Sequence, residues 1–141
     1  NRYLELRMQA DALSTVLEGD VMQVCASGGL FRVERPAEEQ PRCDAREIVP
    51  AGPIFGPKMK AAEGVPRAWE QAVLDEFDIA PDDWLRYRKL TAGTRRACIV
   101  RLDDLAVRED AEGLWFEFIL PAGAYATVLL GEFMKPRGQE A

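Results

Sequence analysis

A run of prolines and glycines near the middle of the chain restricts its fold more than any other feature. Between Glu47 and Pro57, apolar residues alternate with three prolines and two glycines. Proline fixes φ and has no N–H group to donate, so both a regular helix and a central strand are disfavoured there. We therefore expect a rigid, extended loop, which is either a packed connector or a loop that meets a ligand.

The segments on either side of this loop alternate between helical and strand patterns. Apolar residues recurring every three or four positions predict helices over residues 1–17, 65–77 and 124–134, with a further helix opening at Pro81. Alternating apolar residues predict strands at 21–25, 30–33, 95–102, 105–107 and 114–120. The polar segment 34–42 is expected to be a surface loop or a short helical turn. This mixture predicts an α+β fold with mainly antiparallel pairing.

The chain of 141 residues contains no histidine and three cysteines, namely Cys25, Cys43 and Cys98. The absence of histidine excludes Ser-His-Asp and Cys-His catalysis and histidine-ligated zinc. The cysteines form no C-x-x-C pair, so we expect reduced, buried thiols and neither a metal nor a cofactor. No apolar run approaches the roughly 20 residues that a membrane helix needs, and no membrane partner is expected.

Positive charge is concentrated in one late window of a chain whose net charge is −6. Between Leu85 and Arg101 there are six basic residues and no acidic one: Arg86, Arg88, Lys89, Arg95, Arg96 and Arg101. With the rings of Trp84 and Tyr87 beside them, these cations are suited to contact RNA phosphates and bases. The alternative is a solvated helix face with charged strand edges that limit aggregation.

Other polar positions have simpler explanations. The acidic pairs Asp82-Asp83 and Asp103-Asp104 fit a helix N-terminus and a turn. Glu117 interrupts an apolar strand, where it either faces solvent or pairs with an arginine. Tyr125 follows a Pro-Ala-Gly turn at the start of the last helix, and its ring either projects towards a cleft or packs in the core.

Ordered motifs over nearly all of the chain resemble one protein family. The segment Phe118–Phe133, FILPAGAYATVLLGEF, is similar to the C-terminal signature of the TruD family of tRNA pseudouridine synthases, with Gly131 where the family usually has an arginine. Further similar motifs follow the family's order: Glu18–Gln23 with Gly29 and Phe31, the loop Val49–Gly56, the helix motif Ala68–Ala72 and the strand start Gly93–Arg96.

This resemblance implies an isomerase that converts a uridine of tRNA, uridine 13, to pseudouridine without metal or cofactor. In the family an aspartate attacks the flipped-out nucleotide, the glycosidic bond breaks and the base rejoins through carbon 5. Residues 1–93 would be the later part of an inserted α/β domain, and residues 94–141 the C-terminal part of the antiparallel catalytic domain. Tyr125 aligns with the aromatic residue that lies against the target base, and Arg96 with an arginine of the strand entering the catalytic half.

The family's nucleophilic aspartate lies in a motif that this sequence lacks, and the first residue is Asn1 rather than Met. We therefore expect the C-terminal part of a longer cytoplasmic enzyme, inactive alone. Its expected partners are tRNA and the missing N-terminal catalytic half, with no DNA. One alternative is a non-catalytic RNA-binding module derived from the family, and another is a scaffold whose basic window is only a soluble face.

Overall fold

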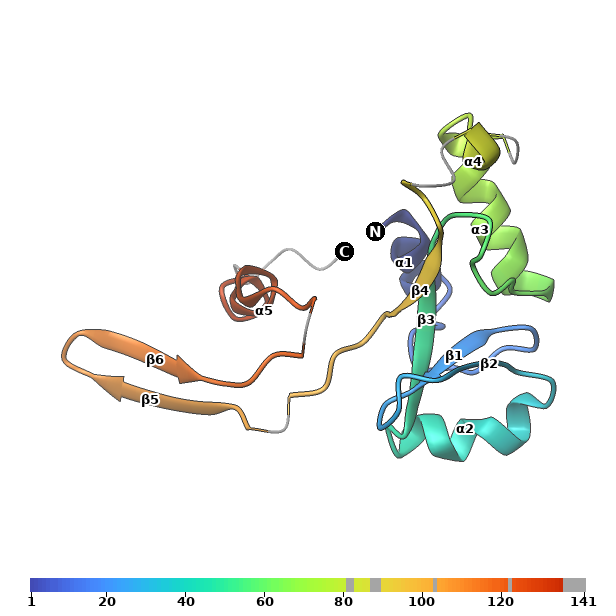
Figure 1. Cartoon of the computed structure of the whole chain (residues 1–141). Helices are drawn as coiled ribbons and strands as arrows, with labels where there is room; N and C mark the ends of the chain where they lie inside the picture. Colours follow the sequence, from blue (N-terminus) through green and yellow to red (C-terminus); the bar gives the residue numbers. More distant parts are fainter. Residues whose placement is uncertain (81–82, 87–89, 103, 122, 136–141) are drawn as a thin grey trace. The chain divides into compact units, whose positions relative to one another are not determined.

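The computed structural model describes residues 1–80, 83–86, 90–102, 104–121 and 123–135, in two compact units, Asn1–Ile99 and Val100–Ala141 (Figure 1). The elements of the first unit are α1 (Arg2–Gln9), β1 (Val21–Val24), β2 (Leu30–Arg32), α2 (Pro36–Asp44), β3 (Ile48–Ile54), α3 (Gly64–Glu76), α4 (Asp83–Arg86) and β4 (Thr94–Ala97). The elements of the second unit are β5 (Ala106–Asp110), β6 (Gly113–Glu117) and α5 (Ala126–Phe133). The predicted α+β class is confirmed.

The sheet of the first unit is antiparallel throughout, with the strand order β2-β1-β3-β4. The strands predicted at 21–25 and 30–33 pair as an antiparallel hairpin, in which Gln23 of β1 lies opposite Leu30 of β2. On its other side, Gln23 lies opposite Val49 of β3. Helix α1 packs against α3 and β3, and α2 packs against β3.

The expectation of an irregular proline-rich loop is wrong, since β3 is a central strand of this sheet. Neither Pro50 nor Pro53 stands where a ladder needs its N–H group. Pro50 O accepts a bond of 2.8 Å from Cys98 N–H, just beyond the pairing of β3 with β4, which starts at Ala51. Because alternate residues of a strand face alternate neighbours, Pro53 faces the side of β1, whose pairing with β3 stops at Pro50. The missing N–H groups therefore interrupt neither ladder.

The first helix is shorter than the predicted span of 1–17, and the polar segment after β2 is more regular than expected. Helix α1 ends at Gln9, and Asp11 adopts a left-handed φ of 51°. The chain turns back there so that Ala12 O accepts two hydrogen bonds from the buried Arg7. Segment 34–42 lies largely in the nine-residue α2, which begins at Pro36. Proline suits the first turn of a helix, where no N–H partner is needed.

The core of the first unit lies between the sheet and α2. It is formed by Val16, Met22, Val33, Cys43 and Ile48, with Val24 and Phe31 packed against it. Helix α3 closely matches the predicted helix over 65–77. Its apolar residues Val73 and Leu74 are buried. The hairpin and α3 therefore form as the apolar periodicity predicts.

The second unit is a two-stranded hairpin and one helix. Strands β5 and β6 pair from Ala106 opposite Glu117 to Asp110 opposite Gly113. The Phe116 ring of β6 lies 5.0 Å from that of Phe133 in α5, measured between ring centroids. Nearly every residue of these strands is exposed, and α5 has no buried residue. This unit therefore lacks a core of its own. An isolated hairpin without such a core is only marginally stable in water.

Within the described ranges, no helix is both long enough and apolar enough to span a membrane.

Candidate functional site

The six residues of the predicted basic site do not share one environment. Arg86 at the end of α4 and Arg96 in β4 are exposed, as is Arg101, which belongs to the second unit. Arg88 and Lys89 lie outside the described residues. Arg95, in contrast, is buried. The window therefore supplies at least two different kinds of arginine.

An RNA contact requires a side chain on the surface, and Arg95 is buried. It forms an interior ion pair with Glu70 of α3. Its Nη1 lies 2.6 Å from Glu70 Oε1, and both side chains are fully buried. Its guanidinium also donates to Lys60 O, at 2.8 Å from Nε and 2.6 Å from Nη2, and to Ala51 O at 3.2 Å. Arg95 thus joins β4 to β3, α3 and the loop between them, which is a structural role.

The Glu70 carboxylate is held by charge more than by aligned hydrogen bonds. Among the described residues, neither of its oxygens accepts a hydrogen bond of good geometry. Arg67 Nη1 lies 3.6 Å from Oε2, in addition to the Arg95 contact. Burial raises the pKa of Glu70 above its ordinary value, and the two arginines oppose that rise. Two motifs of the family resemblance, at Glu70 and Arg95, therefore meet as one buried pair.

A second buried ion pair joins α1 to the start of β1. Arg7 Nη1 lies 2.5 Å from Asp20 Oδ1, and Nη2 lies 3.1 Å from Oδ2. The Asp20 carboxylate also accepts the Leu17 N–H at 2.9 Å. Arg7 lies 5.8 Å from the centre of the Trp69 ring. Asp20 ends a turn, because its N–H donates to Leu17 O at 3.1 Å, and its pairing with Arg7 was not predicted from the sequence. Tyr3 and Arg7 are four residues apart, which places them on one face of the helix. This spacing is the sequence feature that could have indicated that Arg7 lies on the buried face.

Tyr3, on the same face of α1, makes stability sensitive to alkaline pH. Burial raises its pKa to about 12. An unfolded tyrosine ionises near pH 10, so this contribution is complete below about pH 10 and is lost between about pH 10 and 12. We expect Tyr3→Phe to remove this pH-dependent loss of stability, which amounts to about 1.4 kcal/mol at about pH 11, midway between the unfolded and folded pKa values. Urea unfolding at about pH 8 and about pH 11 checks this, and equal alkaline losses in both proteins would contradict it.

Tyr125 projects from the start of α5 and does not enter a core. It is the N-terminal flanking residue of the helix, with an extended backbone at φ −117° and ψ 126°. Its side chain is 64% exposed within the described structure. The ring therefore does not pack in a core within the described structure. A Cβ at nearby Gly131 would meet no atom within 4 Å, so glycine is not required there by packing.

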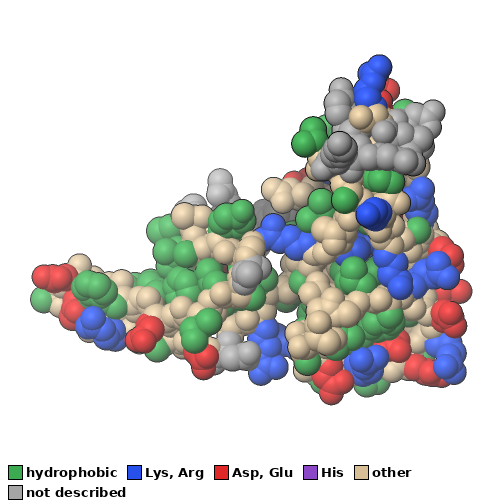
Figure 2. Space-filling model, viewed as in Figure 1, with side chains coloured by type: hydrophobic (Ala, Val, Ile, Leu, Met, Phe, Trp, Pro, Cys, Tyr) green, Lys and Arg blue, Asp and Glu red, His purple; other side chains and the backbone are tan. Residues whose placement is uncertain are grey.

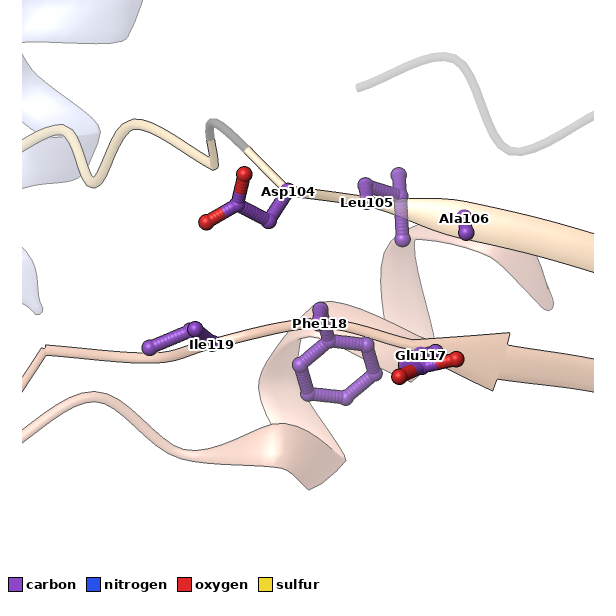
Figure 3. A pocket seen from close by; sticks show the side chains of 6 residues that line it. All are labelled: Asp104, Leu105, Ala106, Glu117, Phe118 and Ile119. Atoms are coloured by element: carbon purple, nitrogen blue, oxygen red, sulfur yellow. The ribbon is translucent and has the colours of Figure 1, made fainter.

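A hollow of about 520 Å³ opens in the second unit where β5 and β6 diverge (Figure 3). It is lined by Asp104, Leu105, Ala106, Glu117, Phe118 and Ile119. The exposed Glu117 confirms a position on the solvated side of its strand. Two carboxylates beside apolar side chains suit a cationic or hydrogen-bond-donating group. Tyr125 is not among the lining residues.

Metal-binding chemistry finds little support in the described part of the chain. No three Cys, Asp or Glu residues gather there closely enough to hold an ion.

Cys43 is buried, but Cys98 is only partly buried and Cys25 is exposed, which corrects the expectation of three buried thiols. Asp83 accepts the Ala80 N–H at 2.9 Å, as its predicted place at a helix start requires. Asp82 and Asp103 lie outside the described residues.

The fold defines an α+β protein whose motif residues Asp20, Glu70 and Arg95 stabilise a helix-covered antiparallel sheet. A family model described as tRNA pseudouridine synthase D (TruD) matches residues 1–133. This chain belongs to the TruD family, as the sequence resemblance predicts.

Relatives and a solved structure agree with this assignment. The tRNA pseudouridine synthase D of Anaeromyxobacter dehalogenans strain 2CP-C is 42% identical over 135 residues, which make up 96% of this chain and 39% of that protein. A protein of the same name from Thermus thermophilus is 40% identical over 96% of this chain and 36% of its own length. The chain thus spans less than two fifths of these relatives.

The crystal structure of a Methanosarcina mazei protein assigned as tRNA pseudouridine synthase D (TruD) has the same fold. It matches with a TM-score of 0.76 and 23% identity, over 94% of this chain and 34% of the other.

Proposed function

We propose that this chain is the C-terminal part of a cytoplasmic tRNA pseudouridine synthase that isomerises uridine 13 of its substrate. The match of the family model over residues 1–133 carries this proposal. The nucleophilic aspartate is assigned to the part of the protein outside these residues, because no aspartate here stands in the family's nucleophile motif. Residues 1–93 are assigned to the inserted domain and residues 94–141 to the catalytic domain. The first compact unit ends later, at Ile99, because β4 pairs with β3.

The second unit supports a partner made of the remaining protein. Hydrophobic side chains gather on its surface in Figure 2. Leu114 and Ile119 of the hairpin segment are 62% and 72% exposed, and Val128 of α5 is 65% exposed. Such a cluster normally marks an interaction surface. We assign it to the N-terminal catalytic half, because the relatives are more than twice as long as this chain.

In this proposal Tyr125 and the exposed arginines contact the RNA. Tyr125 stacks on the flipped uracil, which its exposed position at the start of α5 permits. Arg86, Arg96 and Arg101 neutralise tRNA phosphates, together with Arg88 and Lys89. Arg95 is left out of this set because its side chain is buried against Glu70.

The test is pseudouridine formation in an unmodified tRNA transcript by the full-length protein. The wild-type protein is expected to modify uridine 13, and a fragment of residues 1–141 to form no product. Tyr125→Ala in the full-length protein should slow the reaction at least about tenfold, since stacking of a base on a ring contributes about 1–3 kcal/mol. Tyr125→Phe, which keeps the ring, is the matched control.

Two outcomes would contradict the proposal in different ways. Wild-type turnover by Tyr125→Ala would remove the stacking role alone. Tight tRNA binding without any pseudouridine formation by the full-length protein would favour the non-catalytic RNA-binding module.

A further inference from the structure

Two aromatic rings from distant parts of the first unit lie stacked on each other. Phe55 follows β3 directly, and Trp84 lies in α4. Their ring centroids are 6.1 Å apart and their planes meet at 12°. Both residues are only partly buried. The pair therefore presents aromatic surface to solvent at a fixed place on the molecule.

Close backbone contact holds the loop that follows Phe55 against residues 91–93. A Cβ on Gly56 would lie 2.3 Å from Thr91 O, and a Cβ on Gly93 would lie 2.6 Å from Gly56 Cα. The Lys58 N–H donates to Ala92 O at 2.8 Å. These contacts leave no room for a side chain at either glycine. The loop after β3 is thus held against the chain that follows α4.

The two chain segments that carry Phe55 and Trp84 also carry exposed basic residues. Lys58 and Lys60 are exposed on the loop after β3, and Arg86 is exposed two residues after Trp84. From Phe55 to Lys60 the sequence holds no acidic residue. The nearby acid Asp83 accepts the Ala80 N–H and is committed to the start of α4.

We infer that Phe55 and Trp84, with Lys58 of the loop that follows Phe55, form a binding site for an unpaired segment of the RNA substrate. A nucleobase stacks on the exposed part of the ring pair, and Lys58 neutralises a neighbouring phosphate. Rings supply affinity for any base, while cations supply a salt-dependent term. This inference rests on the proposed function, which makes tRNA the ligand.

The experiment measures binding of an unmodified tRNA transcript to the full-length protein as a function of salt. Trp84→Leu removes the stacking surface but keeps an apolar side chain, and should weaken binding by about fivefold or more. Trp84→Phe keeps a ring and should bind within about twofold of wild type. Lys58→Gln should lower the slope of log affinity against log salt by about 0.7–0.9.

Arg35→Gln is the matched control for the lost charge. Arg35 is an exposed cation of the same unit, paired with Glu38, and its removal should leave the slope unchanged. Because Lys58 is exposed, its substitution tests the site even if Trp84→Leu perturbs folding.

Two results would overturn the inference, and they are distinguishable. If the wild-type protein forms pseudouridine while Trp84→Leu and Lys58→Gln bind tRNA like wild type, only this site is excluded. If the wild-type protein fails to bind tRNA at all, the inference falls together with the proposed function.

Discussion

Replacing Arg95 by alanine is expected to lower the free energy of unfolding by about 3–5 kcal/mol. The substitution leaves the Glu70 carboxylate buried without its partner at 2.6 Å. It also removes the donors to Lys60 O and Ala51 O. Urea unfolding followed by tryptophan fluorescence measures the change. A loss below about 1 kcal/mol, the usual range for exposed pairs, would show that the pair contributes little.

The deficit should depend on pH in a defined direction. Burial raises the pKa of Glu70, and without Arg95 less opposes that rise. A carboxyl whose folded pKa is raised contributes stability that is present below its unfolded pKa, about 4.3, and lost as pH rises. The Arg95→Ala protein should therefore be closest to wild type near about pH 4.5 and fall further behind towards about pH 7. Adding Glu70→Gln should flatten this dependence.

The neighbouring Arg96 provides the matched control. Its side chain is exposed on the other face of β4, so Arg96→Ala should change stability by less than about 1 kcal/mol. In the full-length protein the substitution should instead weaken tRNA binding. The slope of log affinity against log salt should fall by about 1, the value for one lost phosphate contact. An unchanged slope would show that Arg96 does not contact a tRNA phosphate.

A comparable loss, about 3–5 kcal/mol, is expected for Asp20→Ala. The Arg7 guanidinium is 0% exposed and would keep only neutral partners, namely Tyr3 Oη and the carbonyls of Ala12 and Thr15. The Leu17 N–H would also lose its acceptor. Thermal unfolding of the variant measures the change.

Glu38→Ala is the control for Asp20→Ala. It breaks the exposed pair between Arg35 and Glu38, whose side chains are 74% and 56% exposed. Solvent screens such a pair, and its loss should cost less than about 1 kcal/mol. Equal effects of the two substitutions would contradict the structural importance of the Arg7–Asp20 pair.

Local sequence patterns were sufficient where one chain segment decides its own structure. The hairpin of β1 and β2 forms across Ser27-Gly28-Gly29, and Gly28 has the positive φ of 71° that such a turn requires. The apolar stripe of α3 likewise predicts its span within a residue or two. The family was recognisable because its motifs occur in order, and the family model matches the same residues.

The proline-rich segment shows where local rules fail. Proline excludes a central strand only if its missing N–H falls inside a ladder. In β3 the pairing with β1 stops at Pro50 and the pairing with β4 starts at Ala51, so the missing N–H of each proline falls where the neighbouring strand is no longer paired. The register of two neighbouring strands decides this, and neither register is encoded within residues 47–57.

The candidate site divides in the same way. The sequence by itself determined the family, the basic window and the aromatic Tyr125 at a helix start. Alternation along a strand also requires that Arg95 and Arg96 face opposite sides. Only the tertiary structure decided which of the two is buried, because α3 brings Glu70 against one face of β4. The helix that covers a strand is set by packing between distant segments, and charge spacing along the chain carries no record of it.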